Sequence, residues 1–169
     1  MNRRLIVSAD DLGLHEAINA GVVEAHEEGI VTSASLVACG AAFAHATRLV
    51  EPLKALDLGI HLTLVEEKPL LARELLPTLA PEGVLPRTYG QLFAKLVRGG
   101  IDLREIELEM DAQIQRVLKA GLHPSHLDSH QHTHFFPQVR SIVFKLAERY
   151  GIRNVRAAGK VVPHWTKFS

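Results

Sequence analysis

The chain has 169 residues, of which 47% are hydrophobic, and its 19 basic and 19 acidic residues give a formal net charge of zero. This length and composition predict one soluble α/β domain with a substantial core and exclude a largely disordered chain. The balanced charge argues against a nucleic-acid partner. The single cysteine, Cys39, excludes an internal disulfide and agrees with a cytoplasmic location.

Apolar runs rich in β-branched residues alternate with longer amphipathic stretches, a rhythm typical of parallel β-α units. The first run breaks at Ser8 and is too short for a signal peptide or a membrane span, so we expect no membrane association. Strands are predicted at 4–9, 30–38, 58–65, 123–129 and 152–158. Helices are predicted at 15–29, 41–56, 88–99, 102–121 and 136–151, with Pro52 starting, kinking or breaking the second.

Two stretches between the third and fourth strands differ in character. The segment with Pro69, Pro77, Pro81 and Pro86 reads as a long excursion rather than core. The helix expected at 102–121 instead carries an apolar stripe typical of a core-facing helix. The stripe consists of Ile106, Met110, Ile114, Val117 and Leu118.

The order of elements favours a single domain over residues 1–169 with a parallel sheet, either open and doubly wound or curled towards a β/α barrel. In both architectures ligands bind at the carboxyl ends of the strands. The polar residues at those ends are therefore the candidates for function.

Three strands carry unusual polar residues near their ends. Asp10 and Asp11 follow the first predicted strand, His61 lies within the third, and His126 and Asp128 close the fourth. An aspartate can be a helix cap, and a histidine among apolar residues is commonly a hydrogen-bonded core residue. A cap needs only one aspartate, however, and three coincidences at one edge are a poor explanation.

The segment HLDSHQHTH places histidines at 126, 130, 132 and 134, within a chain that has ten. Along an extended strand of roughly 3.3 Å per residue, the first and last would lie about 26 Å apart. Metal–nitrogen bonds are about 2.1 Å long, so a straight strand cannot bring all four to one ion. We therefore expect the strand to end near Asp128 and the remainder to turn across the site, with only one or two of these histidines as ligands.

A carboxylate with two imidazoles is a common way to hold a divalent cation while leaving positions for water. A second carboxylate beside it could accept a proton from that water. The three clusters thus predict a metal-dependent hydrolytic site, in which Asp10 or Asp11 is the spare carboxylate.

Three segments in this order resemble the YdjC-like carbohydrate deacetylases, which include the chitooligosaccharide deacetylases: SADDLG (8–13), GIHLTL (59–64) and HLDSHQHTHFFP (126–137). The segment VEEKPLL is also similar to relatives found with hopanoid-synthesis genes. The resemblance implies a partial or shortened β/α barrel related to the polysaccharide deacetylases, and removal of an acetyl group from an N-acetylated sugar.

The resemblance also implies roles for particular residues. Asp11, His61 and His126 would bind the metal, and Asp10 would be the general base. Histidines 130, 132 and 134 would surround the site, with His130 or His132 as a candidate acid, and Asp128 would support the site. The family is usually described as Mg²⁺-dependent, whereas two imidazoles suit Zn²⁺ or a similar ion better.

Family members usually continue past the point where this sequence stops, so we expect a shortened barrel, a fragment or a homodimer whose partner covers the open side. His164 and Trp165 could then substitute for missing sugar contacts, although Trp165 could equally be a packing residue. Two other functions stay open. One is a metal-binding but catalytically silent domain that acts through a partner, and the other is a different metallohydrolase such as a phosphoesterase.

Overall fold

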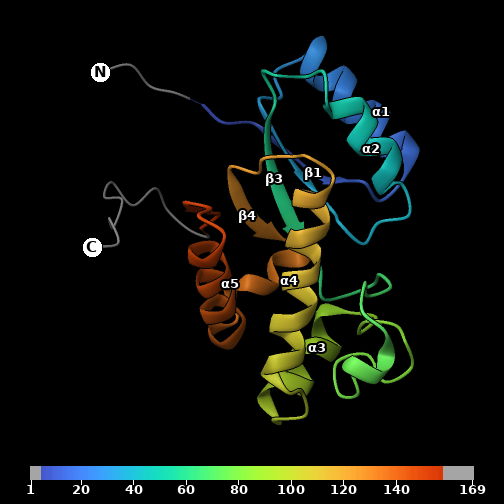
Figure 1. Cartoon of the computed structure of the whole chain (residues 1–169), viewed down its shortest axis with the longest axis vertical. Coiled ribbons are helices and arrows are strands. Elements are labelled where there is room, and N and C mark those ends of the chain that lie inside the picture. The colour runs from blue at the N-terminus through green and yellow to red at the C-terminus, as the bar shows by residue number, and fades with distance from the viewer. Residues whose placement is uncertain (1–4, 158–169) are drawn as a thin grey trace.

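The computed structural model describes residues 5–157, which form one parallel β-sheet with helices packed around it (Figure 1). Neighbouring strands pair in the order β1-β2-β3-β4-β5, and every pair is parallel. The strands are β1 (Ser8–Leu12), β2 (Ser33–Leu36), β3 (Asp57–Leu62), β4 (His126–Ser129) and β5 (Asn154–Val155). The predicted α/β class is confirmed. Because strand order follows chain order without reversal, the winding is that of consecutive strands in a β/α barrel rather than a doubly wound sheet.

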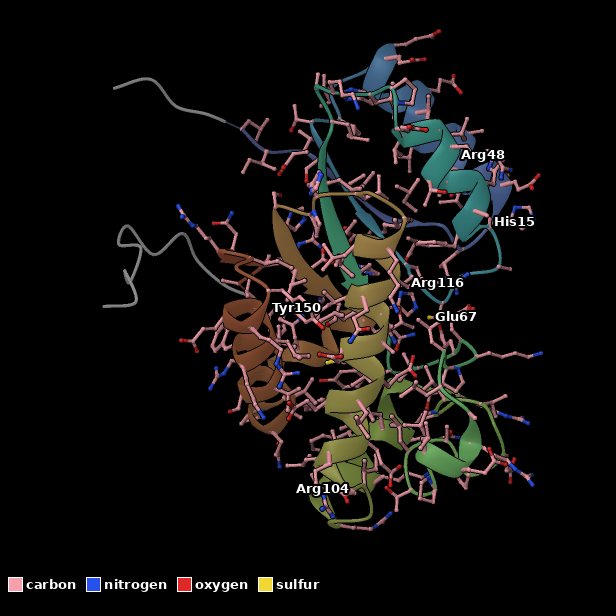
Figure 2. The ribbon with its side chains drawn as sticks, viewed as in Figure 1. His15, Arg48, Glu67, Arg104, Arg116 and Tyr150 are labelled. Carbon is pink, nitrogen blue, oxygen red and sulfur yellow. The ribbon has the colours of Figure 1, made fainter. Side chains whose placement is uncertain are left out.

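Helices connect the strands and pack in pairs: α1 on α2, and α4 on α5 (Figure 1). They are α1 (Glu16–Glu27), α2 (Phe43–Val50), α3 (Tyr89–Val97), α4 (Leu103–Lys119) and α5 (Pro137–Arg149), with short 3-10 turns η1 (Arg73–Leu75) and η2 (His130–Phe135). Arg116 of α4 reaches towards α2, where its guanidinium lies 4.4 Å from the centre of the Phe43 ring (Figure 2). Within residues 5–157, no helix has the length and apolar character needed to cross a membrane.

The first strand is shifted towards the carboxyl end relative to the prediction. Leu5 and Ile6 are exposed, and pairing with β2 begins at Ser8. Because β1 runs from Ser8 to Leu12, the two aspartates lie inside the strand rather than after it. They lie where the register with β2 is irregular, between Ala9 and Leu12. The prediction that they follow the strand is therefore wrong, because the apolar run was taken as the strand although Leu5 and Ile6 lie before the first paired residue.

Four helices begin and end within two residues of the prediction, whereas α2 ends at Val50, six residues before the predicted end and just before Pro52. Glu51 still has helical backbone angles, but Pro52 has no N–H with which to continue the helical hydrogen bonds, which explains the early end. The predicted apolar stripe of α4 is confirmed as core: Ile106, Met110, Ile114 and Val117 are buried. Burial of each such side chain contributes roughly 1.5–3 kcal/mol, so the stripe fixes α4 against the sheet.

The proline-rich excursion between β3 and α3 contributes to the core, contrary to the prediction. Its residues Leu76, Leu79, Ala80 and Leu85 are buried. Polar side chains of α4, one helical turn apart, hold its backbone: Glu105 accepts hydrogen bonds from the amides of Thr78 and Leu79, and Glu109 from those of Leu70 and Leu71. The prolines had suggested an excursion outside the core. The segment can instead be buried because the buried carboxylates of α4 accept hydrogen bonds from its backbone amides.

Gly59 is required by the pairing of β3 with β4. Gly59 lies opposite His126 in the register, and a Cβ atom on Gly59 would clash with the imidazole of His126. The missing side chain of one strand therefore makes room for the ring of the next.

We predict that Gly59→Ala lowers the free energy of unfolding by about 1–3 kcal/mol, because the added methyl displaces a packed ring. Urea denaturation measures the change. Gly21→Ala is the matched control: nothing lies within 4 Å of a Cβ at this position in α1, and the substitution should stabilise by about 0.5–1 kcal/mol. If the clash with the ring causes the loss, Gly59→Ala should destabilise the His126→Ala protein much less than it destabilises the wild type. An equal loss in both backgrounds would contradict this account.

Candidate metal and active site

Polar groups from β1, β3 and the turn after β4 meet at the carboxyl edge of the sheet. Asp11 Oδ1 lies 3.4 Å from His61 Nε2 and 2.9 Å from His130 Nδ1. The His61 ring is buried, whereas Asp11 and His130 are partly exposed. The parallel register thus joins groups that are 119 positions apart in sequence.

His61 is oriented from behind by Asp128. Its Nδ1 lies 2.7 Å from Asp128 Oδ1, and Ser35 Oγ lies 3.1 Å from the same nitrogen. An Nδ1–H that donates to the carboxylate leaves Nε2 facing Asp11. Burial alone would lower the pKa of His61, but hydrogen bonds to Asp11 and Asp128 outweigh it and raise the pKa to about 9. Without a metal the ring is an imidazolium at neutral pH, so binding of a cation at Nε2 must displace a proton.

Two groups of metal-ligand type share His61. They are Asp11–His61–His130 and Asp10–His61–Asp128. The two groups differ in their contacts with Arg156, which pairs with both carboxylates of the second. Its Nη1 and Nη2 donate to Asp10 at 2.7 and 2.8 Å, and Nη1 lies 3.0 Å from Asp128 Oδ2. A guanidinium stays charged at any physiological pH, so the second group is already neutralised and would repel a cation. Asp11, His61 and His130 are therefore the candidate cation site.

The separations within this group fit one ion. Ligands bound at about 2.1 Å, with angles of about 90–110° between them, lie roughly 3.0–3.4 Å apart. The contacts of Asp11 to the two rings, at 3.4 and 2.9 Å, are close to these values. All three ligand atoms lie within 4.8 Å of one another, so these side chains could bind one divalent cation and leave positions open for water.

Asp10 lies beside this group but is held by different partners. Burial raises the pKa of its carboxyl, but the Arg156 hydrogen bonds and the nearby His61 charge outweigh burial and lower the pKa. Ser35 Oγ also donates to Asp10 Oδ1 at 3.3 Å. Asp10 is consequently an ionised, partly exposed hydrogen-bond acceptor next to the cation site.

The backbone around the site is strained. Within residues 5–157 the non-glycine residues with positive φ are Asp11 (65°), Glu66 (69°), Gln131 (50°) and His132 (55°). A left-handed backbone costs an ordinary residue about 1–2 kcal/mol. All four border the cation group or the turn that carries His130, and such clustering is typical of functional sites.

His126 does not join the cation group, although the family resemblance implied that it would bind the metal. It lies at the amino end of β4 opposite Gly59, and its Nδ1 is 2.8 Å from Ser125 Oγ and 3.7 Å from Asp57 Oδ2. Strand alternation puts His126 on the same face as Asp128, but two residues, about 6.6 Å, further from the edge. The histidine that reaches Asp11 is His130, at the start of η2.

The remaining predicted residues surround the site in different ways. Asp128 is buried behind His61, as the expected support of the site. The buried ring of His134 contacts Ser129 Oγ through Nδ1 and the Arg156 carbonyl through Nε2, at 2.5 and 2.9 Å. The exposed ring of His132 stacks on Phe135 at 5.3 Å between centroids. Trp165 and His164 lie outside the described residues.

Three residues of the site were missed from the sequence: Ser35, Glu66 and Arg156. Ser35 contacts both Asp10 and His61, Arg156 pairs with Asp10, and Glu66 Oε2 lies 2.9 Å from His130 Nε2. Each lies at or just after the carboxyl end of a strand, or in the middle of a short one. Inspection of every polar residue at the strand ends, rather than only histidines and paired aspartates, would have found them.

Fold and site together define an α/β protein with barrel-like winding and a candidate carboxylate–imidazole cation site at the carboxyl edge. The sequence profile of the family described as YdjC-like protein matches residues 4–168. The chain belongs to this family, and the resemblance of its three motifs is confirmed.

Relatives carry names that describe deacetylases. The chain is 41% identical over 150 residues to a carbohydrate deacetylase of Halalkalibacterium halodurans, and 40% identical over 153 residues to a chitooligosaccharide deacetylase of Escherichia fergusonii. The alignments cover 88% and 90% of this chain. They cover 62% and 58% of the relatives, so the chain spans about three fifths of their length.

A solved structure from Enterococcus faecalis V583, named for a proposed role in cellobiose-phosphate cleavage, has the same fold. It superposes with a TM-score of 0.82 at 31% sequence identity, over 95% of this chain and 61% of that one. The similarity supports the arrangement of strands that brings the site together.

We predict that His130→Ala lowers the affinity for Zn²⁺ at least about 100-fold, because it removes one of three ligands, whereas His126→Ala changes it by less than about threefold. Isothermal titration calorimetry measures both, and circular dichroism checks that each variant is folded. Equal losses in the two variants, or a loss confined to His126→Ala, would contradict this ligand set.

Proposed function

We propose that this chain forms the metal-binding and catalytic part of a carbohydrate deacetylase, which hydrolyses the acetamido group of an N-acetylated sugar to acetate and an amine. One observation carries the proposal. An ionised carboxylate, Asp10, lies beside a group fit for a cation but is bound to Arg156 instead of belonging to that group. A hydrolytic site needs this division between a group that binds the cation and one that accepts a proton.

Asp11, His61 and His130 are the proposed ligands. A divalent cation bound there would polarise the acetyl carbonyl and make a neighbouring water more acidic. Two imidazoles suit Zn²⁺ and similar transition ions, while the family resemblance favours Mg²⁺, so an assay needs both.

Asp10 accepts the proton of the attacking water in this proposal. The water oxygen bonds to the carbonyl carbon, the C–N bond then breaks, and the nitrogen gains a proton as it leaves. Arg156 holds the Asp10 carboxylate ionised and directs it with two hydrogen bonds, at 2.7 and 2.8 Å. Both effects make Asp10 an acceptor that is in place before substrate arrives.

We assign the proton for the leaving amine to His132. Of the other histidines on this turn, His130 is committed to the cation group and His134 is buried between Ser129 and Arg156. His132 is exposed, and its ring nitrogens have no hydrogen-bond partner within residues 5–157. An exposed imidazole on the same turn as His130 is proposed to exchange a proton with a bound substrate.

The sugar substrate is inferred from the relatives, whose names specify carbohydrate and chitooligosaccharide deacetylases. A two-metal phosphoesterase is the weaker alternative, because the second carboxylate group already contains the Arg156 guanidinium. A metal content near two ions per chain would favour it.

We predict that Asp10→Asn lowers kcat for acetate release from N,N′-diacetylchitobiose by about 10²–10⁴-fold, because an amide cannot accept the proton of water. Metal affinity should change little, since Asp10 lies outside the ligand group. An enzyme-coupled acetate assay with Zn²⁺ or Mg²⁺ measures the rates.

Asp57→Asn is the matched control for this experiment. It makes the same chemical change at the amino end of β3, far from the carboxyl edge, and should leave kcat unchanged. The deacetylase assignment fails if Asp10→Asn keeps the wild-type rate, or if the metal-loaded wild-type chain releases no acetate from a panel of acetylated oligosaccharides.

A further inference from the structure

Glu66, on the segment after β3, binds the turn that carries His130 with both of its carboxylate oxygens. Oε2 accepts from His130 Nε2 at 2.9 Å, and Oε1 accepts from Gln131 Nε2 at 2.7 Å. The Glu66 backbone is itself fixed, because its amide donates to the Pro86 carbonyl at 2.9 Å. The carboxylate is thus held in place before any cation is bound.

Stability alone gives no reason for this arrangement. The Glu66 side chain is 46% exposed, and exposed ion pairs contribute only about 0–1 kcal/mol. Its left-handed backbone, with φ of 69°, costs about 1–2 kcal/mol. Since the contacts at best offset the strain, the arrangement points to a role in the site.

The two nitrogens of the His130 ring face different carboxylates. Nδ1 lies 2.9 Å from Asp11, in the cation group, and Nε2 lies 2.9 Å from Glu66. A neutral imidazole can bind a cation only through the nitrogen that carries no proton. A carboxylate that accepts from Nε2–H therefore selects the tautomer whose Nδ1 lone pair faces the cation.

The second contact of Glu66 acts on the backbone of the same turn. Gln131 and His132 both have left-handed backbones, directly after His130. The hydrogen bond from the Gln131 side chain to Glu66 ties this strained pair to the segment after β3. One carboxylate consequently controls the orientation of the ring through the first contact and the path of the turn through the second.

We propose that Glu66 is a positioning residue that sets the tautomer and orientation of His130 as a metal ligand. The inference rests on the cation site of the proposed function. In this inference, Glu66 orients the His130 ring towards the cation in the way that Asp128 orients the His61 ring.

The test is Zn²⁺ binding by Glu66→Gln, measured by isothermal titration calorimetry. A glutamine can accept from His130 through its carbonyl oxygen, and Gln131 can turn its own amide to accept from the new one. A neutral amide is, however, a weaker acceptor than a carboxylate and can also present its NH₂ group to His130, so it no longer fixes the tautomer. The expected result is a 10–100-fold weaker affinity with an unchanged stoichiometry. Glu67→Gln is the matched control on the same segment (Figure 2), removes the same charge, and should leave the affinity unchanged.

A second variant separates the proposed role from general damage to the turn. In Gln131→Ala the Glu66 carboxylate keeps its hydrogen bond to His130 and loses only its contact with the neighbouring side chain, so the affinity should stay within about threefold of wild type. A loss in Gln131→Ala as large as in Glu66→Gln would contradict a role through the His130 ring. In the zinc-loaded wild-type chain, ¹⁵N–¹H correlation of the ring should place the His130 proton on Nε2. A proton on Nδ1, or wild-type affinity in Glu66→Gln, would overturn the role of Glu66 alone. Failure of the wild-type chain to bind Zn²⁺ or Mg²⁺ would overturn it together with the proposed function.

Discussion

The site depends on one buried hydrogen bond, between His61 Nδ1 and Asp128 Oδ1 at 2.7 Å. Asp128 is fully buried, and an isolated carboxylate there would cost several kcal/mol. Two cations compensate it: the imidazolium of His61, and Arg156, whose Nη1 lies 3.0 Å from Oδ2. Because the register places His61 directly opposite Asp128, the strand pairing that builds the sheet also builds this pair.

The same two partners determine what happens on either side of Asp128. His61 presents Nε2 to Asp11, which opens one side to a cation. Arg156 turns to Asp10, which keeps that carboxylate ionised and prevents it from competing as a ligand. Removal of either partner would leave the charge of Asp128 poorly compensated. Removal of His61 would also disrupt the candidate cation group, and removal of Arg156 would release Asp10. Structure and function are therefore coupled through a single buried charge.

Much of the fold could be predicted from the sequence, because it follows from periodic patterns. The α4 stripe with Ile106 and Met110 repeats with the helical period, and the apolar run around His61 predicts a buried strand; both elements were placed correctly. The excursion was misjudged because its burial depends on Glu105 and Glu109, which lie far along the chain and look like ordinary exposed residues of a helix. A tertiary contact of this kind leaves no local signal.

The histidine-rich segment shows where such prediction stops. Strand rise and bond length were sufficient to predict that β4 ends near Asp128 and that the histidines divide their roles, and β4 does end at Ser129. They could not show which histidine reaches the cation group, because the answer depends on a turn in which Gln131 and His132 take left-handed conformations that no local sequence pattern signals. That conformation is stabilised by contacts with residues distant in sequence, such as that of Gln131 with Glu66, and it places His130 over the end of the sheet. His126, to which the family resemblance assigned a ligand role, instead fills the space beside Gly59. Within nine residues, the histidine proposed as a ligand is thus selected by the strained turn rather than by the regular strand.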